Sequence, residues 1–241
     1  RAVRAAPITG RRRTPSLDKP MSRLLCLFAL LLPATALAQE EDQELWLTGA
    51  ASVGLGDKTK FEFDTVSRFG NDPGGLYEVE INTLIAHEVA EGVTIGGGYV
   101  RNINYSRGTV TRTEDRLRVQ VGLSDTVGAV KLSGRVRLEN RWRSDGDDTG
   151  YRLRPQTKAT LPLGDSPFSL VASHESLIPL NDTDWGEEAG YDRMRNLLAV
   201  NWKASKLVSI EAGYLNQYRF GRGGDRDTMD HALAISVGLS L

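Results

Sequence analysis

The sequence is poor in the residues that stabilise small exported domains and in those that mark catalytic centres. It contains one cysteine, Cys26, and three histidines among its 241 residues. A single cysteine excludes an internal disulfide, so stability has to come from packing and backbone pairing. No stretch approaches 18 consecutive apolar residues, which excludes a helical membrane protein. The formal net charge of −1 gives no electrostatic support for nucleic-acid binding.

The N-terminal region has the order of features found in secretory signal peptides. A Met-Ser-Arg start at residue 21 is followed by an apolar run and then by Ala-Leu-Ala at residues 36–38. We therefore interpret residues 21–38 as a cleaved signal peptide and residues 39–241 as a single mature domain. Residues 1–20 are rich in arginine and proline, and we interpret them as an unstructured upstream extension. The protein is expected to be exported.

Residues 129–143 show the pattern that dominates the rest of the chain. In AVKLSGRVRLENRWR, alternate positions carry mostly apolar and mostly charged side chains. A period of two predicts a β-strand with one apolar face and one charged face. A strand of this length, tilted by about 40°, rises roughly 35–40 Å, which exceeds the apolar band of about 25 Å in a membrane barrel. Lipid on one side and a polar lumen on the other would satisfy both faces.

The same alternation recurs along the chain. It is found in residues 45–53, 59–69, 76–88, 93–105, 110–123, 150–163, 168–176, 191–203, 207–220 and 231–241. Tight turns alternate with connections that are mostly longer and rich in Gly, Asp and Asn, which is typical of outer-membrane barrels. Bacterial single-chain barrels normally have an even number of strands. We therefore predict ten strands, with residues 45–53 as a separate N-terminal segment, and keep twelve as the alternative.

The predicted fold is all-β: a transmembrane, antiparallel, up-and-down β-barrel of the bacterial outer-membrane type. The competing architecture is a soluble barrel whose apolar side chains point inward. Strands in soluble proteins cluster near 5–6 residues, and many of these segments exceed twelve, which favours the membrane barrel. Aromatic residues near the strand ends, including Tyr77, Tyr99, Trp142 and Trp202, suit the lipid interface.

Basic side chains outnumber acidic ones by roughly two to one at the positions predicted to face the lumen, whose sign sets ion preference. The candidate solute-binding residues are Arg116, Arg118, Arg135, Arg137, Glu139, Arg141, Arg152, Arg154, Arg193, Arg195 and Glu211. Their charge suggests a narrow channel or a binding site for small anionic solutes. The alternative is a filled structural barrel, in which Arg and Glu on neighbouring strands pair and the outer loops face a partner.

A catalytic function receives little support from the sequence. Residues 173–176 read Ser-His-Glu-Ser and contain nucleophile, base and acid side chains. Consecutive strand residues point to opposite faces, so His174 cannot meet Glu175 and falls on the lipid side. We predict that the protein is not an enzyme, with a surface lipid hydrolase as a third alternative. No metal-ligand spacing appears, and no cofactor is expected.

Three short segments carry a family resemblance: RVRLENR at residues 135–141, YRLR at 151–154 and EAGYLNQ at 211–217. With these segments the chain resembles the DUF2490 family of bacterial outer-membrane barrels. The resemblance implies a barrel in the outer membrane and supplies no substrate. An Arg-lined small barrel is also similar to oligogalacturonate-specific porins, which implies acidic sugars as a solute class.

The expected partners are outer-membrane lipid, a small anionic solute and the outer-membrane assembly machinery, with no nucleic acid. The C-terminal stripe that would contact the assembly machinery consists of Ile235, Val237, Leu239 and Leu241.

Overall fold

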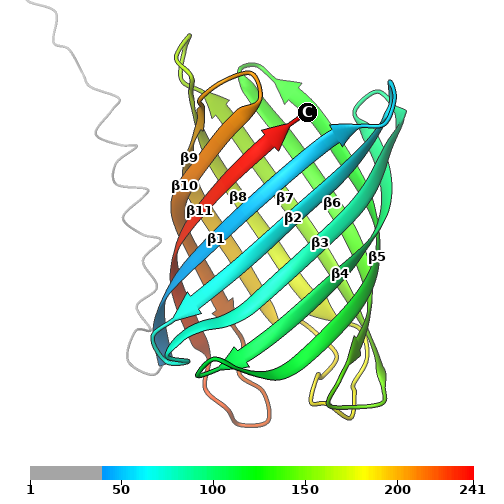
Figure 1. Cartoon of the computed structure of the whole chain (residues 1–241), viewed down its shortest axis with the longest axis vertical. Helices are drawn as coiled ribbons and strands as arrows, with labels where there is room; N and C mark the ends of the chain where they lie inside the picture. The colour runs from blue at the N-terminus through cyan, green and yellow to red at the C-terminus, as the bar shows by residue number, and fades with distance from the viewer. Residues whose placement is uncertain (1–39) are drawn as a thin grey trace, which may run out of the picture. The chain divides into compact units, whose positions relative to one another are not determined.

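A computed structural model describes residues 40–241, which form a closed barrel of eleven strands (Figure 1). The upstream extension and the signal peptide predicted for residues 1–38 lie outside the described residues. The strands are β1 (Glu40–Gly54), β2 (Thr59–Gly70), β3 (Gly75–Ala90), β4 (Val93–Ser106), β5 (Thr109–Val127), β6 (Val130–Arg143), β7 (Thr149–Pro162), β8 (Phe168–Pro179), β9 (Arg193–Lys203), β10 (Val208–Arg219) and β11 (Thr228–Ser240).

The barrel closes through a parallel pairing of β1 with β11, whereas all other neighbouring strands are antiparallel. Thr48 in β1 lies opposite Val66 of β2 on one side and opposite Ser236 of β11 on the other. At the end of this seam, the Leu241 N–H donates to the Ser52 carbonyl at 2.8 Å. The count of eleven is close to the predicted ten or twelve but is not even, and residues 45–53 belong to the barrel instead of forming a separate segment. A parallel seam satisfies both edges of β1, so closure does not require an even number.

The two ends of the barrel have different connections. Tight turns at one end use Gly92, Gly128 and Gly164, whose φ angles of 69°, 61° and 60° favour glycine. The other end carries the longest connections, residues 180–192 and 220–227. β1 starts at this loop-rich end. Because the number of strands is odd, β11 finishes at the opposite, tight-turn end, where Figure 1 marks the C-terminus.

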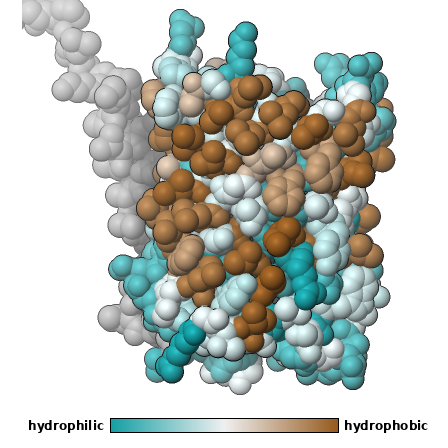
Figure 2. All heavy atoms as spheres, in the orientation of Figure 1, coloured by the Kyte–Doolittle hydropathy of each residue, from teal (hydrophilic) through white to brown (hydrophobic). Residues whose placement is uncertain are grey.

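Apolar side chains face outward from the barrel, and charged side chains face inward. On β5, Leu117 and Val119 are 55% and 59% exposed, whereas their neighbours Arg116 and Arg118 are buried. Figure 2 shows apolar side chains gathered across one face of the wall, with polar ones concentrated toward its ends. The arrangement excludes the competing architecture, a soluble barrel whose apolar side chains fill the interior. Within residues 40–241, no helix has the length and apolar character needed to cross a bilayer.

One predicted interface aromatic points the other way. Tyr99, Trp142 and Trp202 are exposed on the outside, but the Tyr77 hydroxyl donates to Glu44 Oε2 at 2.9 Å on the lumenal side. The pairing of β2 with β3 shifts register at Arg68, immediately beside Tyr77. A bulge of this kind re-aims a side chain, which simple alternation cannot anticipate.

Candidate functional site: the lumenal ion-pair network

Strand β6 places a row of charged side chains inside the barrel. Arg137, Glu139 and Arg141 are buried, whereas Leu138, which lies between Arg137 and Glu139 in the sequence, is 37% exposed on the outside. β5 and β7 flank β6 and present their own arginines to the same interior. The cross-strand partner of Glu139 is Arg118 on β5 and Arg152 on β7. The pairing of β5, β6 and β7 therefore brings their charged side chains together in one part of the lumen.

Glu139 is the central acceptor of this network. Its side chain is completely buried, with 0% exposure. Arg152 donates to Glu139 Oε2 from Nη2 at 2.6 Å and from Nε at 2.9 Å, and Arg154 Nη1 donates to Oε1 at 2.8 Å. Arg137 Nη1 lies 3.8 Å from Oε1. One carboxylate thus neutralises charge from β6 and β7 in a space that water does not reach.

Glu175 on β8 is a second acceptor, and it was not among the predicted site residues. Arg154 Nη2 donates to its two oxygens at 2.9 and 3.1 Å, and Arg135 Nη2 donates to Oε1 at 2.7 Å. Arg195 Nη1 of β9 lies 3.7 Å from Oε2. Because Arg154 bridges Glu139 and Glu175, the predicted residues from β6, β7 and β9 are joined in one network. The sequence contains a signal for this residue, because alternation places Glu175 on the face opposite to His174 and therefore in the lumen.

Glu114 on β5 organises a neighbouring group nearer the loop-rich end. Arg116 Nε donates to Glu114 Oε1 at 2.7 Å, and Arg141 Nε donates to the same oxygen at 2.5 Å. Arg116 Nη1 also donates to Glu80 Oε2 of β3 at 2.9 Å. Arg141 Nη1 pairs with Glu187, which belongs to the connection between β8 and β9. The network therefore extends from the barrel wall into a loop.

Trp185 of the same connection packs over this end of the network. The guanidinium carbons of Arg141 and Arg143 lie 5.1 and 4.6 Å from its ring centroid, which is cation–π geometry. Its indole N–H donates to the Asp148 carbonyl at 3.0 Å, so the loops after β6 and β8 hold each other. A Cβ on Gly150 would lie 2.6 Å from the Trp185 ring, so the glycine makes this approach feasible.

Two small spaces lie in the interior of the loop-rich half. One cavity of about 80 Å³ is lined by members of both ion-pair groups, among them Glu80, Glu114, Arg116, Arg152 and Arg154. A second of about 220 Å³ lies toward the mouth. The lining of the second includes Glu44, Trp46, Arg68, Arg193, Arg195 and Asp230. Side chains therefore fill most of this half of the lumen.

Trp46 of β1 contributes the aromatic surface on the opposite wall. It is 6% exposed and packs with Leu215 and Ala232 in the small apolar cluster of the interior. The guanidinium carbons of Arg68 and Arg195 lie 4.2 and 4.9 Å from its ring centroid. Sequence alternation placed Trp46 near a strand start and did not identify it as a lumenal residue. The Trp46 ring therefore stabilises the guanidinium groups of Arg68 and Arg195 through cation–π contacts.

Arg118 is a predicted site residue that pairs with no carboxylate among the described residues within 4 Å. It is 5% exposed, and its Nη1 and Nη2 donate to Asn82 Oδ1 at 3.1 Å and to the Thr83 carbonyl at 3.3 Å. Neutral oxygens accept its hydrogen bonds without cancelling its charge. Arg137 resembles it, since Nε and Nη2 donate to Gln120 Oε1 at 3.1 and 3.0 Å.

Two other predicted residues make their ion pairs outside the network. Arg193 at the start of β9 pairs with Asp192, whose Oδ2 lies 2.5 Å from the guanidinium Nε. Burial raises the pKa of Asp192, but Arg193 outweighs burial and holds that pKa below its ordinary value. Glu211 accepts from Lys158 Nζ at 3.2 Å in the tight-turn half of the barrel. Among the described residues, neither forms an ion pair within the Glu139 network, although Arg193 lines the same small cavity as Arg152 and Arg154.

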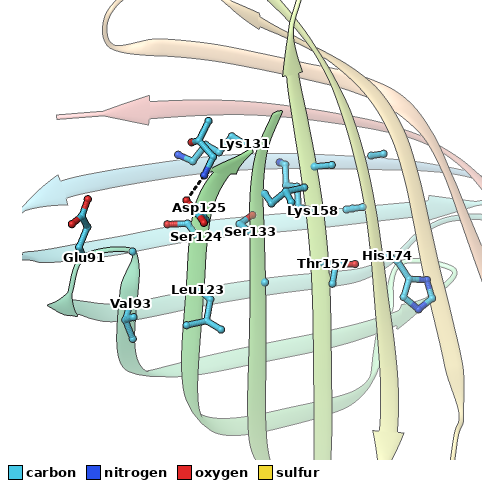
Figure 3. A pocket seen from close by; sticks show the side chains of 17 residues that line it. Glu91, Val93, Leu123, Ser124, Asp125, Lys131, Ser133, Thr157, Lys158 and His174 are labelled. Carbon is cyan, nitrogen blue, oxygen red and sulfur yellow. Dashed lines mark hydrogen bonds between the residues drawn. The ribbon is translucent and has the colours of Figure 1, made fainter. Parts of the chain in front are cut away.

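The tight-turn half of the lumen is lined by smaller side chains. Its inward positions include Gly96, Gly98, Gly122, Ser124, Gly213, Ala234, Ser236 and Gly238. A hollow of about 1350 Å³ lies at this end of β5 to β8. Figure 3 shows Lys131, Ser133 and Lys158 on its lining. Residues of both faces of the wall contribute to the hollow, including outward-facing Leu123 and His174. The lumen is therefore filled by large charged side chains at the loop-rich end and lined by smaller ones at the tight-turn end.

Comparison with known proteins assigns the chain to a family. Residues 43–228 match the family model described as "Protein of unknown function (DUF2490)". The chain belongs to the DUF2490 family. An uncharacterised protein of Methylorubrum extorquens is 30% identical over 216 residues, covering 88% of this chain and 93% of that protein. The family resemblance expected from the three sequence segments is confirmed.

Solved structures of the outer-membrane protein OmpT of Vibrio cholerae are also similar. One is 13% identical with a TM-score of 0.39, covering 71% of this chain and 59% of that chain. A mutant of the same protein lacking loop L8 is 14% identical with a TM-score of 0.38, covering 71% and 60%. The DUF2490 chain thus spans less than two thirds of the OmpT chains that it matches.

Proposed function

We propose that this protein is an outer-membrane barrel whose lumen is closed by buried ion pairs, so that it does not conduct solutes. The observation that carries the proposal is the complete burial of Glu139 between arginines of β6 and β7. Side chains that line an aqueous pore remain in contact with water, and this one does not. Passage of anions, the leading expectation from the sequence, is therefore less well supported than a filled barrel.

The surface of the barrel supports the membrane location. Leu233, Val237 and Leu239 of β11 are 53%, 42% and 42% exposed, and other strands repeat the pattern. An exposed apolar surface of this extent marks a membrane or protein contact. Closed barrels satisfy all backbone groups internally, which is required of strands in lipid. We propose that the exposed stripe of β11 also serves the assembly machinery, as the sequence suggested.

Cell fractionation and solute permeation test this proposal together. We expect the full-length protein to co-fractionate with outer-membrane markers. Liposomes containing the purified, folded protein should not swell in arabinose, whereas a general porin reconstituted in parallel should allow swelling. Swelling by the wild-type protein at a rate comparable to the porin would refute the closed lumen. Recovery in the soluble periplasmic fraction would refute the location.

A second candidate function is the binding of a small anion from the tight-turn side of the network. Arg118 and Arg137 pair mainly with neutral oxygens, and Arg135 lies two positions from Arg137 on the same face. Among the described residues, Arg118 Nε and Arg135 Nε are buried without a hydrogen-bond partner. Buried, incompletely paired guanidinium groups are suited to a carboxylate, sulfate or phosphate oxygen.

Isothermal titration of the folded protein with galacturonate, and separately with sulfate, tests anion binding. We expect binding that Arg118→Gln weakens at least tenfold, while Arg193→Gln, at the loop-rich end, leaves it unchanged. Equal affinities for the wild type and Arg118→Gln would refute this candidate. That result would leave the proposal of a closed lumen unaffected, because solute permeation tests the closed lumen independently.

A further inference from the structure

The outward face of β8 and β9 carries a chain of polar side chains that the lumenal network does not use. His174 and Ser176 are two residues apart on β8 and therefore share one face, and Asn196 of β9 is the cross-strand partner of His174. His174 Nδ1 lies 2.7 Å from Asn196 Oδ1, and His174 Nε2 lies 3.1 Å from Ser176 Oγ. The Tyr191 hydroxyl lies 2.7 Å from the same Ser176 oxygen.

These contacts fix the direction of the hydrogen bonds. Asn196 Oδ1 can only accept, so His174 Nδ1 carries the proton and Nε2 offers its lone pair to the Ser176 hydroxyl. Ser176 then accepts from the Tyr191 O–H. Nucleophile, base and orienting group are each within hydrogen-bond reach of the next, which is how catalytic triads are recognised on unrelated folds.

We propose that Ser176, His174 and Asn196 form the catalytic triad of an acyl-ester hydrolase on the lipid-facing surface of the barrel. The activity goes beyond the proposed function, since it requires neither a closed nor an open lumen. It also departs from the sequence expectation of no enzyme, which considered His174 with Glu175. Glu175 points inward to Arg154, as alternation predicted, and the acid position of the triad is taken by Asn196.

The surroundings point to a lipid ester as the substrate. Leu170 and Leu198, on the same outward face, are 41% and 64% exposed. Figure 3 shows Thr157 and His174 on neighbouring strands at the edge of the hollow. The lining of that hollow also includes the outward-facing small residues Gly134, Ala159 and Ala172. Small side chains on three neighbouring strands leave room for an acyl chain beside the triad.

Two features control access to the nucleophile. Ser176 is 7% exposed beneath Tyr191, which is 41% exposed and contacts the Phe220 ring edge-on at 5.3 Å. Tyr191 belongs to the connection before β9, so a movement of this ring would uncover the serine. On the β7 side, Leu153 and Gln156 have cross-strand partners on β8, but Pro155 has none, because proline has no N–H to donate. The ladder is interrupted next to Ser176.

The proposed reaction is the hydrolysis of an ester by water, and it needs no oxidant or reductant. Ser176 Oγ attacks the acyl carbonyl carbon while its proton moves to His174 Nε2, and the negative carbonyl oxygen accepts from the Tyr191 O–H. The ester C–O bond then breaks, and the proton on Nε2 passes to the departing alcohol oxygen. Water deprotonated by His174 attacks the acyl-serine, which releases the fatty acid and restores the serine.

The test uses the purified, folded full-length protein in detergent micelles and in phosphatidylethanolamine–phosphatidylglycerol vesicles. A fluorophosphonate probe should label the wild type at Ser176, and a fluorogenic phospholipid and nitrophenyl esters should be hydrolysed. Ser176→Ala should abolish labelling, and His174→Ala should lower kcat by about 10³-fold or more. Asn196→Ala and Tyr191→Phe should lower kcat with little change in KM.

Matched controls separate catalysis from structure. Ser173→Ala removes the inward-facing serine of the same strand, and Asn216→Ala removes the outward asparagine opposite Asn196 on β10. Both should retain wild-type hydrolysis. Heat-modifiable migration in gels establishes that every variant is folded. The proposal is overturned if the folded wild type neither reacts with the probe nor hydrolyses any of these esters in both environments. Unchanged activity in folded Ser176→Ala would overturn it as well.

Discussion

Replacing Glu139 with glutamine perturbs the centre of the lumenal network while keeping the size of the side chain. The wild-type carboxylate is fully buried and accepts three hydrogen bonds of 2.6–2.9 Å from Arg152 and Arg154. Among the described residues, Arg152 has no other carboxylate within 4 Å, so its charge would be left buried and unpaired. Removing one partner of a buried pair costs about 3–5 kcal/mol, because the desolvation of the remaining charge is no longer offset. We expect Glu139→Gln to lower the free energy of unfolding by this amount.

Urea titration in lipid vesicles, followed by tryptophan fluorescence and heat-modifiable gel migration, measures the effect. Glu211→Gln is the matched control, since Glu211 pairs with Lys158 through side chains that are 18% and 38% exposed. Partly exposed pairs contribute about 0–1 kcal/mol, so this variant should unfold almost as the wild type does. A difference of less than about 1 kcal/mol between Glu139→Gln and the wild type, which is typical of an exposed pair, would show that Glu139 does not offset a buried charge.

Three further predictions follow from the seam and from the loop contacts. Cysteines replacing Thr48 and Ser236, which are parallel cross-strand partners, should form a disulfide within one chain on oxidation. Non-reducing gels showing no such cross-link would contradict the eleven-strand closure. Trp185→Ala should cost about 2 kcal/mol through lost cation–π contacts and packing, and should speed protease cleavage between β8 and β9. Gly150→Leu should speed the same cleavage, because its Cβ would meet the Trp185 ring; unchanged cleavage would contradict the loop contact.

Alternation along single strands predicted which charged residues of β6 face the lumen, but it missed the inward positions of Tyr77 and Trp46. Arg135, Arg137, Glu139 and Arg141 share one face of β6 because strand geometry requires it. The strand count could not be predicted in the same way. All eleven segments were visible in the sequence, but the expectation of an even number removed residues 45–53 from the barrel. Nothing in the alternation of a strand shows whether its neighbour runs parallel or antiparallel to it.

Contacts between strands were beyond the sequence because they depend on register. The positions of His174 and Ser176 on one face could be read from their spacing, but Asn196 becomes their neighbour only through the pairing of β8 with β9. Glu175 acquires Arg154 through the pairing on the other side of β8, and Trp185 reaches the network through a loop that has no periodicity. Register and loop conformation arise from packing across the whole barrel.

Single-channel recording in planar bilayers measures directly whether the lumen is closed. Purified, folded wild-type protein should insert without producing conductance steps, because buried arginine and glutamate side chains occupy the loop-rich half of the interior. Insertion is checked independently by recovering the folded protein from vesicles of the same lipid. Reproducible open-channel steps from the wild-type protein, of either ion preference, would show that the lumen is open.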